Sequence, residues 1–304
     1  MPPFEPLRPL ALHQLPPLPD LRMAVVGHVE VVSFIEVDTL PQPGTISHAR
    51  SAHEAPAGGG AVVAVQMARL VGAGVPFFTA LGDDALGHQA ATALRELGLE
   101  LHVAWRSAPT RRAVTFVDAS GERTITVVGE RLTPLASDPL PWHRLQEVDG
   151  VFVTAADAQA LRLARAARVL AATPRVRLPV LQEAGVQLDA LIGSGLDPGE
   201  RTSVGDLTPE PRLRIATEGS RGGVRIPGGR FLAPQRIAAV VDTYGAGDSF
   251  AAGVTTGLAA GWSVEEAISL GCHCGAACLD GAGPYGAQLT LIPQDPNPSS
   301  LPPH

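Results

Sequence analysis

The sequence predicts an α/β fold, built on a doubly wound and mostly parallel sheet flanked by helices. The first indication is that short apolar runs alternate with segments of helical pattern along most of the 304 residues. The second is a hydrophobic content of 45% with 17% charged residues, which is enough apolar material for one large α/β domain. The third is that two β-rich regions interrupt the alternation, and these predict a small extra sheet.

The predicted core begins with a buried strand at 22–27, an apolar run that ends in glycine. Three glycines at 58–60 then precede an apolar helix at 61–70, and the next pair is a strand at 75–80 and a helix at 84–97. The alternation continues with strands at 151–154, 178–181 and 213–217, and with helices at 158–171, 246–260 and 263–279. Because a strand–helix–strand unit places its two strands parallel, this order favours a parallel sheet.

The two interrupting regions are 29–55 and 110–129. The first contains β-rich pieces separated by proline and glycine turn residues. The second has the pattern of a hairpin, with strands at 113–117 and 124–128 joined by a short polar turn. Composition alone makes both regions extra strands, and a plain edge hairpin is an alternative for the second.

Both ends of the chain are rich in proline and are expected to be extended tails. Residues 1–20 contain seven prolines, and residues 293–304 have a similar composition. The folded domain is therefore expected at 21–292. The N-terminus lacks the apolar segment of a signal peptide, and no uncharged apolar stretch is long enough to cross a membrane.

The charge composition argues against a nucleic-acid partner and restricts how phosphate can be bound. The formal net charge is −7, and the longest basic run is Arg111–Arg112. The chain contains no lysine, so a cationic contact to phosphate requires an arginine or a metal. Three cysteines, Cys272, Cys274 and Cys278, lie in one predicted helix without a suitably spaced fourth metal ligand. They predict buried free thiols in a reduced, cytoplasmic protein.

The most informative segment is 242–250, which reads DTYGAGDSF. Gly245 and Gly247 allow a tight turn and the close approach of a ligand. The helix that follows directs its free N–H groups at the same loop, which makes an anion site. Asp248 adds a carboxylate beside that site, an odd choice if the site only binds an anion. The combination is explained if Asp248 accepts a proton from a hydroxyl while the loop holds a phosphoryl group.

This segment resembles the second signature of the ribokinase-like (phosphofructokinase-B) carbohydrate kinase family, D-T-x-G-A-G-D-x-F, and it meets all seven fixed positions. The resemblance extends over about residues 22–290. It implies ATP-dependent phosphorylation of a hydroxyl group on a small sugar or sugar-like metabolite. In the catalytic loop it assigns the general base to Asp248, phosphoryl-stabilising N–H groups to Gly245, Ala246 and Gly247, and the shaping of the loop to Asp242 and Thr243.

The resemblance also implies a set of cofactors and a place for each of them. ATP is expected along the loop that carries Thr217, Gly219 and Gly222, with His273 near the adenine. Mg²⁺ is expected at Ser194-x-x-Asp197, which stands where the family has N-x-x-E, and a monovalent cation such as K⁺ is expected near Asp242 and Thr243. A hairpin turn explains the glycines at 219 and 222 equally well, and a packed core histidine is the alternative for His273.

The two β-rich segments, about 29–55 and 110–129, are implied to form a lid over the sugar. A lid made of strands exposes sheet edges, and such edges invite pairing with another chain. Members of the family often clasp two lids together, so the resemblance implies a homodimer through the lid.

The residues expected at the sugar depart from the family pattern. Val32 stands where the family usually has an Asp, and Val63 stands where it has an Asn that holds a sugar hydroxyl. The pocket is therefore expected to make fewer hydrogen bonds than a ribose site. The candidate substrate-binding residues are Glu30, Gly58, Gly59, Arg111 and Arg112. A solvated surface is the alternative for the two arginines.

Two other functions remain open from the sequence. A nucleoside kinase on the same fold is favoured if the less polar pocket holds a base. A non-catalytic metabolite-binding relative is favoured by Val32, Val63 and the altered N-x-x-E motif, and the intact Asp248 loop argues against it. The identity of the substrate is not determined by these residues.

Overall fold

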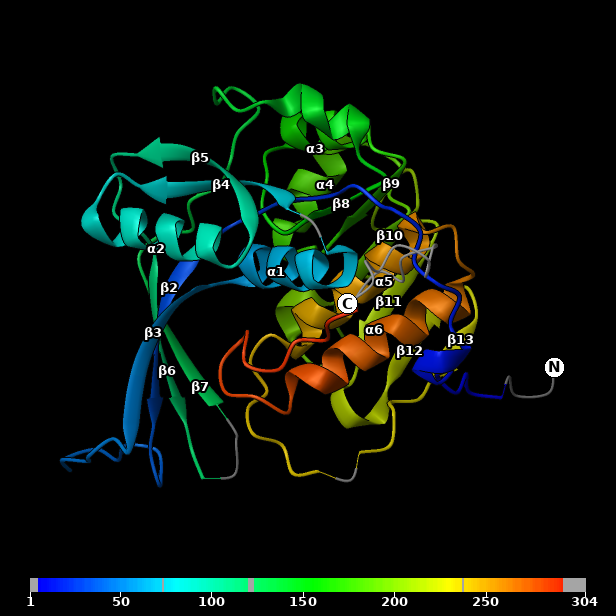
Figure 1. Cartoon of the computed structure of the whole chain (residues 1–304). Helices are drawn as coiled ribbons and strands as arrows, with labels where there is room; N and C mark the ends of the chain where they lie inside the picture. Colours follow the sequence, from blue (N-terminus) through cyan, green and yellow to red (C-terminus); the bar gives the residue numbers. More distant parts are fainter. Residues whose placement is uncertain (1–4, 73, 120–122, 237, 292–304) are drawn as a thin grey trace, which may run out of the picture.

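The computed structural model describes residues 5–72, 74–119, 123–236 and 238–291. The chain forms a sheet of nine strands in the order β13-β12-β11-β10-β9-β8-β1-β4-β5, flanked by helices (Figure 1). The strands are β1 (Met23–Val26), β4 (Val75–Gly82), β5 (Leu99–Arg106), β8 (Gly150–Val153), β9 (Val169–Ala172), β10 (Ala190–Ser194), β11 (Arg214–Thr217), β12 (Gly223–Ile226) and β13 (Gly229–Phe231). Neighbouring strands from β11 to β5 are parallel, and β12 and β13 add an antiparallel hairpin at one edge.

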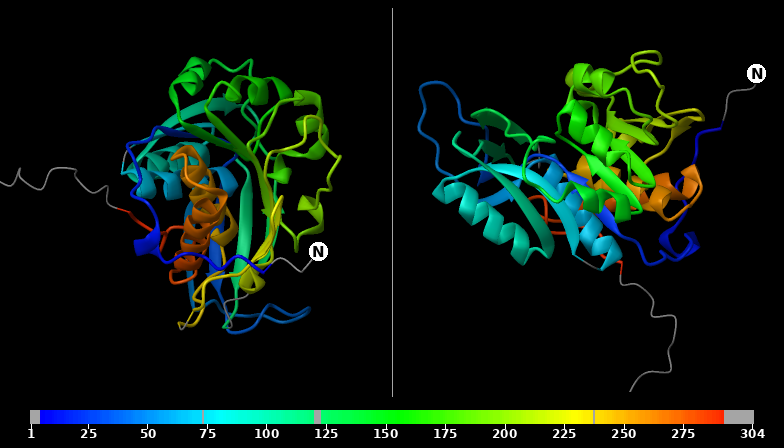
Figure 2. Two further views of the ribbon diagram at one scale, coloured as in Figure 1. Left: turned by 90° about the vertical axis from the view of Figure 1, so that its right-hand side faces the viewer. Right: turned by 90° about the horizontal axis from the view of Figure 1, so that it is seen from above.

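A second sheet of four strands, in the order β3-β2-β6-β7, projects from one side of the main body (Figure 2). Its strands are β2 (Glu30–Glu36), β3 (Ser51–Ala57), β6 (Arg112–Val117) and β7 (Arg123–Val128). β2 pairs antiparallel with β3 and parallel with β6, and β6 and β7 form the predicted hairpin. The predicted fold class, a mostly parallel sheet with a small separate sheet, is confirmed.

The main sheet is covered on both faces because its central strands are apolar on both sides. Met23 and Val25 of β1 belong to one core cluster, whereas Ala24 and Val26 belong to another, as alternation along a strand requires. The helices are α1 (Gly59–Val71), α2 (Ala85–Glu96), α3 (Ala158–Ala164), α4 (Leu178–Ala184), α5 (Ala246–Ala259) and α6 (Val264–Cys278). α1 and α5 pack in the first cluster, and α3 and α4 pack in the second.

Two predicted elements between β8 and β10 are wrong. The helix predicted at 158–171 ends at Ala164, and 169–172 form strand β9. The strand predicted at 178–181 is instead the first turn of α4, which carries a proline at its start and ends at Gly185 in the left-handed conformation. Short apolar runs look alike in helices and buried strands, so their periodicity does not separate the two.

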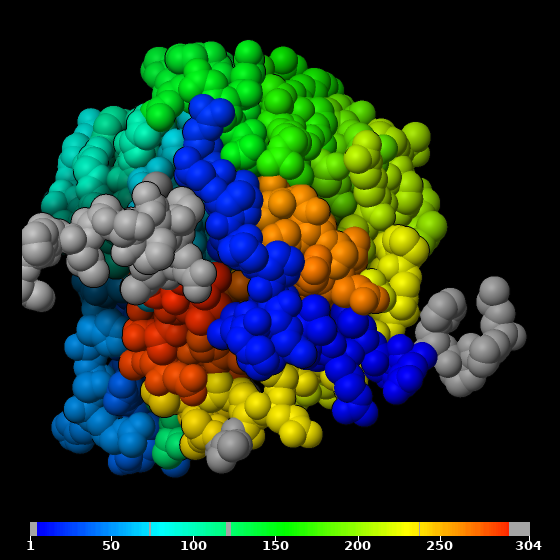
Figure 3. Space-filling view, turned by 45° about the vertical axis from the view of Figure 1, so that its right-hand side comes forward, coloured from blue at the N-terminus to red at the C-terminus, as the bar shows by residue number. Residues whose placement is uncertain are grey.

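The N-terminal segment, expected to be an extended tail, lies against the domain from residue 5 onward. The N–H of Leu7 donates to the carbonyl of Arg230, and the N–H of Leu10 donates to Ser269 Oγ at 2.9 Å. Leu7 and Leu18 pack against the first core cluster. Figure 3 shows this segment in blue, running across the helical face of the molecule. The predicted tail at 293–304 lies outside the described residues.

The three cysteines are free and buried, as predicted. Among the described residues no group of three or more His, Cys, Asp or Glu side chains is placed to hold a metal ion. None of the helices in the described ranges is both long and apolar enough to cross a membrane.

Candidate active site

The two glycine-rich turns meet at the carboxylate of Asp248. Gly59 opens α1 and Asp248 lies in the first turn of α5, two helices that pack together. The space that a Cβ on Gly59 would occupy is 2.9 Å from Asp248 Oδ1. A glycine is therefore needed at 59 to leave the Asp248 carboxylate in its place.

The loop before α5 is fixed by hydrogen bonds on its buried side and is exposed to solvent at Gly247. The buried carboxylate of Asp242 accepts hydrogen bonds from the N–H groups of Tyr244 at 2.8 Å and Gly283 at 2.9 Å. Gly245 has φ 81° and precedes the helix, and no side chain caps the helix start. Gly247 is exposed, with no heavy atom within 4 Å of the position of a Cβ. The N–H of Ala246 donates to the carbonyl of Thr243 at 3.4 Å, whereas the exposed turn at Gly247 is open to an anion.

The surroundings of Asp248 perturb the pKa of its carboxyl. Burial raises the pKa of this carboxyl to about 6, and the nearby charges of Glu200 and Glu30 act in the same direction. The guanidinium groups of Arg175 and Arg123 oppose the shift. A carboxylate with a pKa of about 6 is ionised at neutral pH and accepts a proton more readily than an ordinary aspartate.

Side chains of the small sheet contact the catalytic loop. Arg123 of β7 donates a hydrogen bond to Thr243 Oγ1, and its guanidinium lies 5.9 Å from the centre of the Tyr244 ring. The Tyr244 ring packs edge-on against Phe34 of β2 with centroids 5.0 Å apart. Its hydroxyl donates to Glu30 Oε1 at 3.5 Å. The small sheet is thus joined to the loop that carries Asp248 through both β2 and β7.

Four of the five predicted substrate-binding residues lie together. Glu30 is buried and forms an ion pair with Arg111 at 2.9 Å. The N–H of Gly58 donates to the hydroxyl of Tyr244 at 3.4 Å, which places the start of α1 beside Glu30. Arg112 is exposed, and its nearest carboxylate is Glu54 at 3.9 Å. Arg112 follows Arg111 directly. Because successive residues of a strand face opposite sides of the sheet, its side chain points away from the side on which Arg111 meets Glu30.

The two valines expected at the sugar differ in where they point. Val32 belongs to a small cluster beneath the second sheet with Phe34, Val62 and Tyr244. Val63 belongs instead to the main core with the central sheet. The apolar side chain of α1 that faces the catalytic loop is therefore Val62, and the assignment to Val63 is off by one residue.

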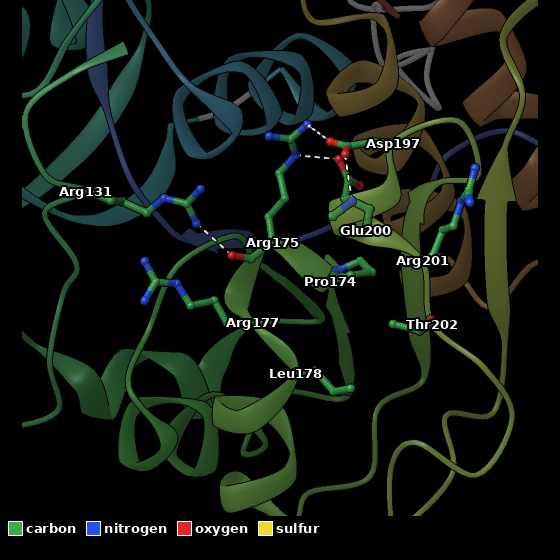
Figure 4. A pocket seen from close by; sticks show the side chains of 10 residues that line it. Arg131, Pro174, Arg175, Arg177, Leu178, Asp197, Glu200, Arg201 and Thr202 are labelled. Atoms are coloured by element: carbon green, nitrogen blue, oxygen red, sulfur yellow. Dashed lines mark hydrogen bonds and ion pairs between the residues drawn. The ribbon is translucent and has the colours of Figure 1, made fainter.

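A cavity of about 350 Å³ opens beyond the ends of β9 and β10. In it Arg175 forms ion pairs with Asp197 at 3.1 Å and with Glu200 at 2.5 Å (Figure 4). The buried Glu200 also accepts a hydrogen bond from the N–H of Ser194 at 2.9 Å. The hydroxyl of Ser194 accepts hydrogen bonds from the N–H groups of Leu196 and Asp197. It therefore stabilises its own turn.

Glu200 lines the same cavity, and the sequence analysis did not single it out. Asp197 and Glu200 stand in a D-x-x-E spacing, three residues further along the chain than the predicted Ser194-x-x-Asp197. Mg²⁺ is commonly bound by one or two carboxylates together with waters and substrate phosphates. The carboxylates of Asp197 and Glu200 both line the cavity and are the groups that would hold such an ion. Their oxygens that do not pair with Arg175 each accept one backbone hydrogen bond, Asp197 Oδ1 from the N–H of Gly199 and Glu200 Oε2 from the N–H of Ser194.

The residues predicted to bind the nucleotide have structural partners. Thr217 ends β11, and its hydroxyl donates to the carbonyl of Gly193 at 3.3 Å. Gly222 has φ 81°, and a Cβ there would lie 2.1 Å from the carbonyl oxygen of Phe231, so the hairpin itself requires this glycine. Gly219, with φ 60°, lies in the same turn. His273 Nε2 contacts the carbonyl oxygen of Leu10 at 2.7 Å, which favours a packing role over an adenine contact.

A second cavity, of about 610 Å³, lies on the side of the small sheet. It is bordered by Arg111 at the start of the β6–β7 hairpin and by Arg131 just after it. Ala155 and Ala156, which follow β8, form an apolar part of its wall. Arg131 and Arg177 border both cavities, so the two spaces adjoin.

Comparison with known proteins agrees with this geometry. A family model described as "pfkB family carbohydrate kinase" matches residues 20–197 and 195–290. An ATP-dependent ribose-1-phosphate kinase from Halopiger xanaduensis is 30% identical over 285 residues, which are 88% of this chain and 94% of that protein. A ribokinase from Arabidopsis thaliana is 25% identical over 301 residues, 86% of this chain and 76% of that protein.

The fold is also found among solved structures. That of Arabidopsis thaliana ribokinase complexed with ribose and ATP is similar with a TM-score of 0.64 and 22% identity, over 87% of this chain and 94% of that one. This likeness concerns the arrangement of the chain, and the family match covers nearly all of the described residues and includes the Asp248 loop. The chain belongs to the pfkB family of carbohydrate kinases, and it is an enzyme of that class.

Proposed function

We propose that the enzyme transfers the γ-phosphoryl group of ATP to a hydroxyl group of a small sugar or sugar-like metabolite, with Asp248 as general base. The observation that carries the proposal is the contact between the Asp248 carboxylate and the start of α1, beside the uncapped first turn of α5. ATP as the donor is supported by the names of two similar proteins.

Each part of the loop has one role in this reaction. The acceptor hydroxyl gives its proton to Asp248 as its oxygen bonds to the γ-phosphorus, and the bond to the departing ADP breaks. The N–H groups of Gly245, Ala246 and Gly247 stabilise the charge on the transferred group. When bound, Mg²⁺ would neutralise nucleotide phosphates, and Asp197 and Glu200 are the residues that would hold it. A K⁺ ion beside Asp242 and Thr243 stays a prediction from the resemblance.

A nucleoside kinase is the second candidate, because Val32, Phe34 and Val62 give the region beneath the small sheet an apolar character. An activity panel that measures ADP release with sugars, sugar derivatives and nucleosides separates the two candidates. Release of ADP with none of these acceptors would favour a non-catalytic relative and would contradict the proposed function.

The rate should depend on pH through Asp248. Because the base must be ionised, kcat/KM should rise between about pH 5 and 7, with a midpoint near the pKa of about 6. The measurement is a pH–rate profile at saturating ATP, checked against melting temperatures over the same range. A profile that stays flat from pH 5 to 8 would exclude a base with this pKa.

We also propose a homodimer through the small sheet, which acts as the lid. β7 is the outer strand of that sheet, and Ile125, Val127 and Val128 are 40%, 43% and 55% exposed. An unpaired edge with apolar side chains favours pairing with a second copy. The free buried cysteines fit the cytoplasm as the place of action.

Val127→Glu should convert the dimer to a monomer, because it introduces a charge on the proposed contact strand. Val204→Glu, at a residue that is 64% exposed and outside the small sheet, is the matched control and should leave the dimer intact. Light scattering at micromolar concentration gives the mass of each variant. A monomeric wild type, or a dimer that tolerates Val127→Glu, would remove the lid from the interface.

A further inference from the structure

We propose that His28 is a further residue of the acceptor site, and that its Nε2–H donates a hydrogen bond to an oxygen atom of the acceptor. This inference rests on the proposed function and deepens it, because it adds a specificity-determining contact beside Asp248. A polar contact from the end of β1 would also offset part of what the site lacks at Val32.

His28 lies at the point of the main sheet where a ligand is expected. β1 has β8 on one side and β4 on the other, so the chain extends the sheet in both directions from this region. His28 comes two residues after the end of β1, and Thr154 comes directly after the end of β8. In open α/β sheets, ligands bind in the crevice beyond the carboxyl ends of two such strands.

Short contacts connect His28 with the carboxylate of Asp248. His28 Nδ1 lies 3.5 Å from Thr154 Oγ1. A Cβ on Gly59 would lie 3.6 Å from the methyl carbon of Thr154 and 2.9 Å from Asp248 Oδ1, and a Cβ on Gly58 would lie 3.1 Å from His28 Nε2. The imidazole therefore lies alongside the glycines that open α1, next to the group that is proposed to accept the proton.

One ring nitrogen of His28 has no partner in the protein. The side chain is buried, with 5% of the residue exposed, and its Nδ1 contacts Thr154. Nε2 forms no hydrogen bond or ion pair within the part of the chain that the structure describes. Because buried polar atoms in proteins are nearly always paired, an unpaired one beside a site indicates a contact that a ligand completes.

The imidazole of His28 is neutral at neutral pH. Burial lowers the pKa of His28 well below its usual value of 6.5, and the positive charges of Arg131, Arg111 and Arg175 act in the same direction. A neutral imidazole has one N–H group and one nitrogen that accepts. His28 therefore acts on a ligand through a hydrogen bond and not through a charge.

Thr154 determines which nitrogen of His28 carries the proton. The Thr154 hydroxyl is buried, and His28 Nδ1 is its one partner among the described residues. If the hydroxyl donates to Nδ1, both groups are paired. If Nδ1 donated instead, the proton of the hydroxyl would be left without an acceptor. Nε2–H is therefore a donor, and it can pair with a hydroxyl, ring or carbonyl oxygen of the acceptor.

The first test compares His28→Gln with His28→Asn, using the best acceptor among the sugars and nucleosides of the activity panel. Glutamine carries its amide nitrogen to about the position of Nε2, whereas asparagine reaches only the position of Nδ1. Loss of one neutral hydrogen bond should raise the KM for the acceptor about 5–10-fold in His28→Asn. His28→Gln should stay within about twofold of the wild type, and the KM for ATP should not change in either variant.

His143→Asn, at an exposed histidine, is the control for loss of an imidazole and should match the wild type. The opposite order, with His28→Asn normal and His28→Gln impaired, would show that His28 acts only by supporting Thr154. That result would overturn the inference.

The second test identifies the oxygen atom that receives the hydrogen bond. Analogues that each lack one oxygen are assayed with the wild type and with His28→Asn, for example 2-deoxyribose for ribose, 2′-deoxyadenosine for adenosine and a carbocyclic analogue for the ring oxygen. Removal of the contacted oxygen should lower kcat/KM about 5–10-fold in the wild type and less than about twofold in the variant. Losses that multiply at every position would mean that His28 contacts none of these oxygens, and the inference would be wrong.

Direct binding keeps this inference separate from the proposed function. Titration calorimetry with the same acceptors uses Asp248→Asn alone and Asp248→Asn combined with His28→Asn. Weaker binding to the combined variant, without turnover by the wild type, would support the acceptor contact and contradict the kinase assignment. Turnover by the wild type with equal binding to both variants would do the reverse, and binding of no acceptor would contradict both. Melting temperatures show whether each variant is folded.

Discussion

Asp248→Asn should lower kcat by about 10²–10⁴-fold, because the variant loses the group that accepts the proton of the acceptor hydroxyl. The carboxylate lies in the first turn of α5 and against the start of α1, where the acceptor hydroxyl is proposed to bind. The N–H groups of the loop are unchanged in the variant, and they should still hold the phosphoryl group of the nucleotide. The measurement is steady-state turnover together with the affinity for ATP.

The stability of this variant provides the control. The folded pKa of Asp248, about 6, lies above its ordinary value of 3.8, so stability falls as pH rises through that window. Above pH 6 the ionised carboxylate lowers the free energy of unfolding, and an asparagine at this position does not. Asp248→Asn should therefore melt at or above the wild-type temperature at pH 7.5. A variant that melts normally and keeps more than about a tenth of the wild-type kcat would contradict the assigned role.

The glycine turn at 242–248 and the helix that follows it could be predicted from sequence because they depend on neighbouring residues. Gly245, Gly247 and Asp248 lie within four residues, at the start of α5. The hairpin of β6 and β7 was predicted for a similar reason, since two alternating runs separated by a turn specify their own pairing. The parallel core followed from the order of its apolar runs, although β5, β9, β10, β12 and β13 were not recognised.

Features that depend on distant parts of the chain could not be predicted. Glu200 enters the site through its contact with Arg175, 25 residues earlier, and nothing in the local sequence marks that pairing. Tyr244 occupies the variable position of the signature, yet it joins Glu30, Gly58 and Phe34. The error between Val62 and Val63 has the same origin, because only packing decides which of two adjacent apolar residues on a helix faces the loop.

These long-range contacts join the small sheet to the loop that carries Asp248. Arg123 from β7 reaches Thr243, and Glu30 from β2 reaches Tyr244, and both contacts fall within the residues that precede Gly245. The charges of Arg123 and Glu30 also act on Asp248 in opposite directions. If the small sheet moved relative to the loop, we expect the effect of both charges on the pKa of Asp248 to change.

Gly59→Ala should lower kcat/KM by about 100-fold or more without loss of stability. The added Cβ would stand 2.9 Å from Asp248 Oδ1, closer than real contacts allow, so the carboxylate must move. Displacement of a reacting group by about 1 Å can cost about 10²-fold in rate. Alanine is favoured over glycine in a helix, and Gly59 is the first residue of α1, so the helix itself should tolerate the change.

Two other glycines make this prediction specific to the Asp248 carboxylate. Gly60→Ala would meet the backbone of His28 at 2.7 Å, so it should lower the melting temperature. Gly74→Ala meets only the carbonyl of Gly98 at 3.8 Å, an ordinary contact, and should change neither rate nor stability. Steady-state kinetics and thermal melts of the three variants give the comparison. If Gly59→Ala keeps its rate within about threefold of the wild type, Asp248 does not act from the position that the structure gives it.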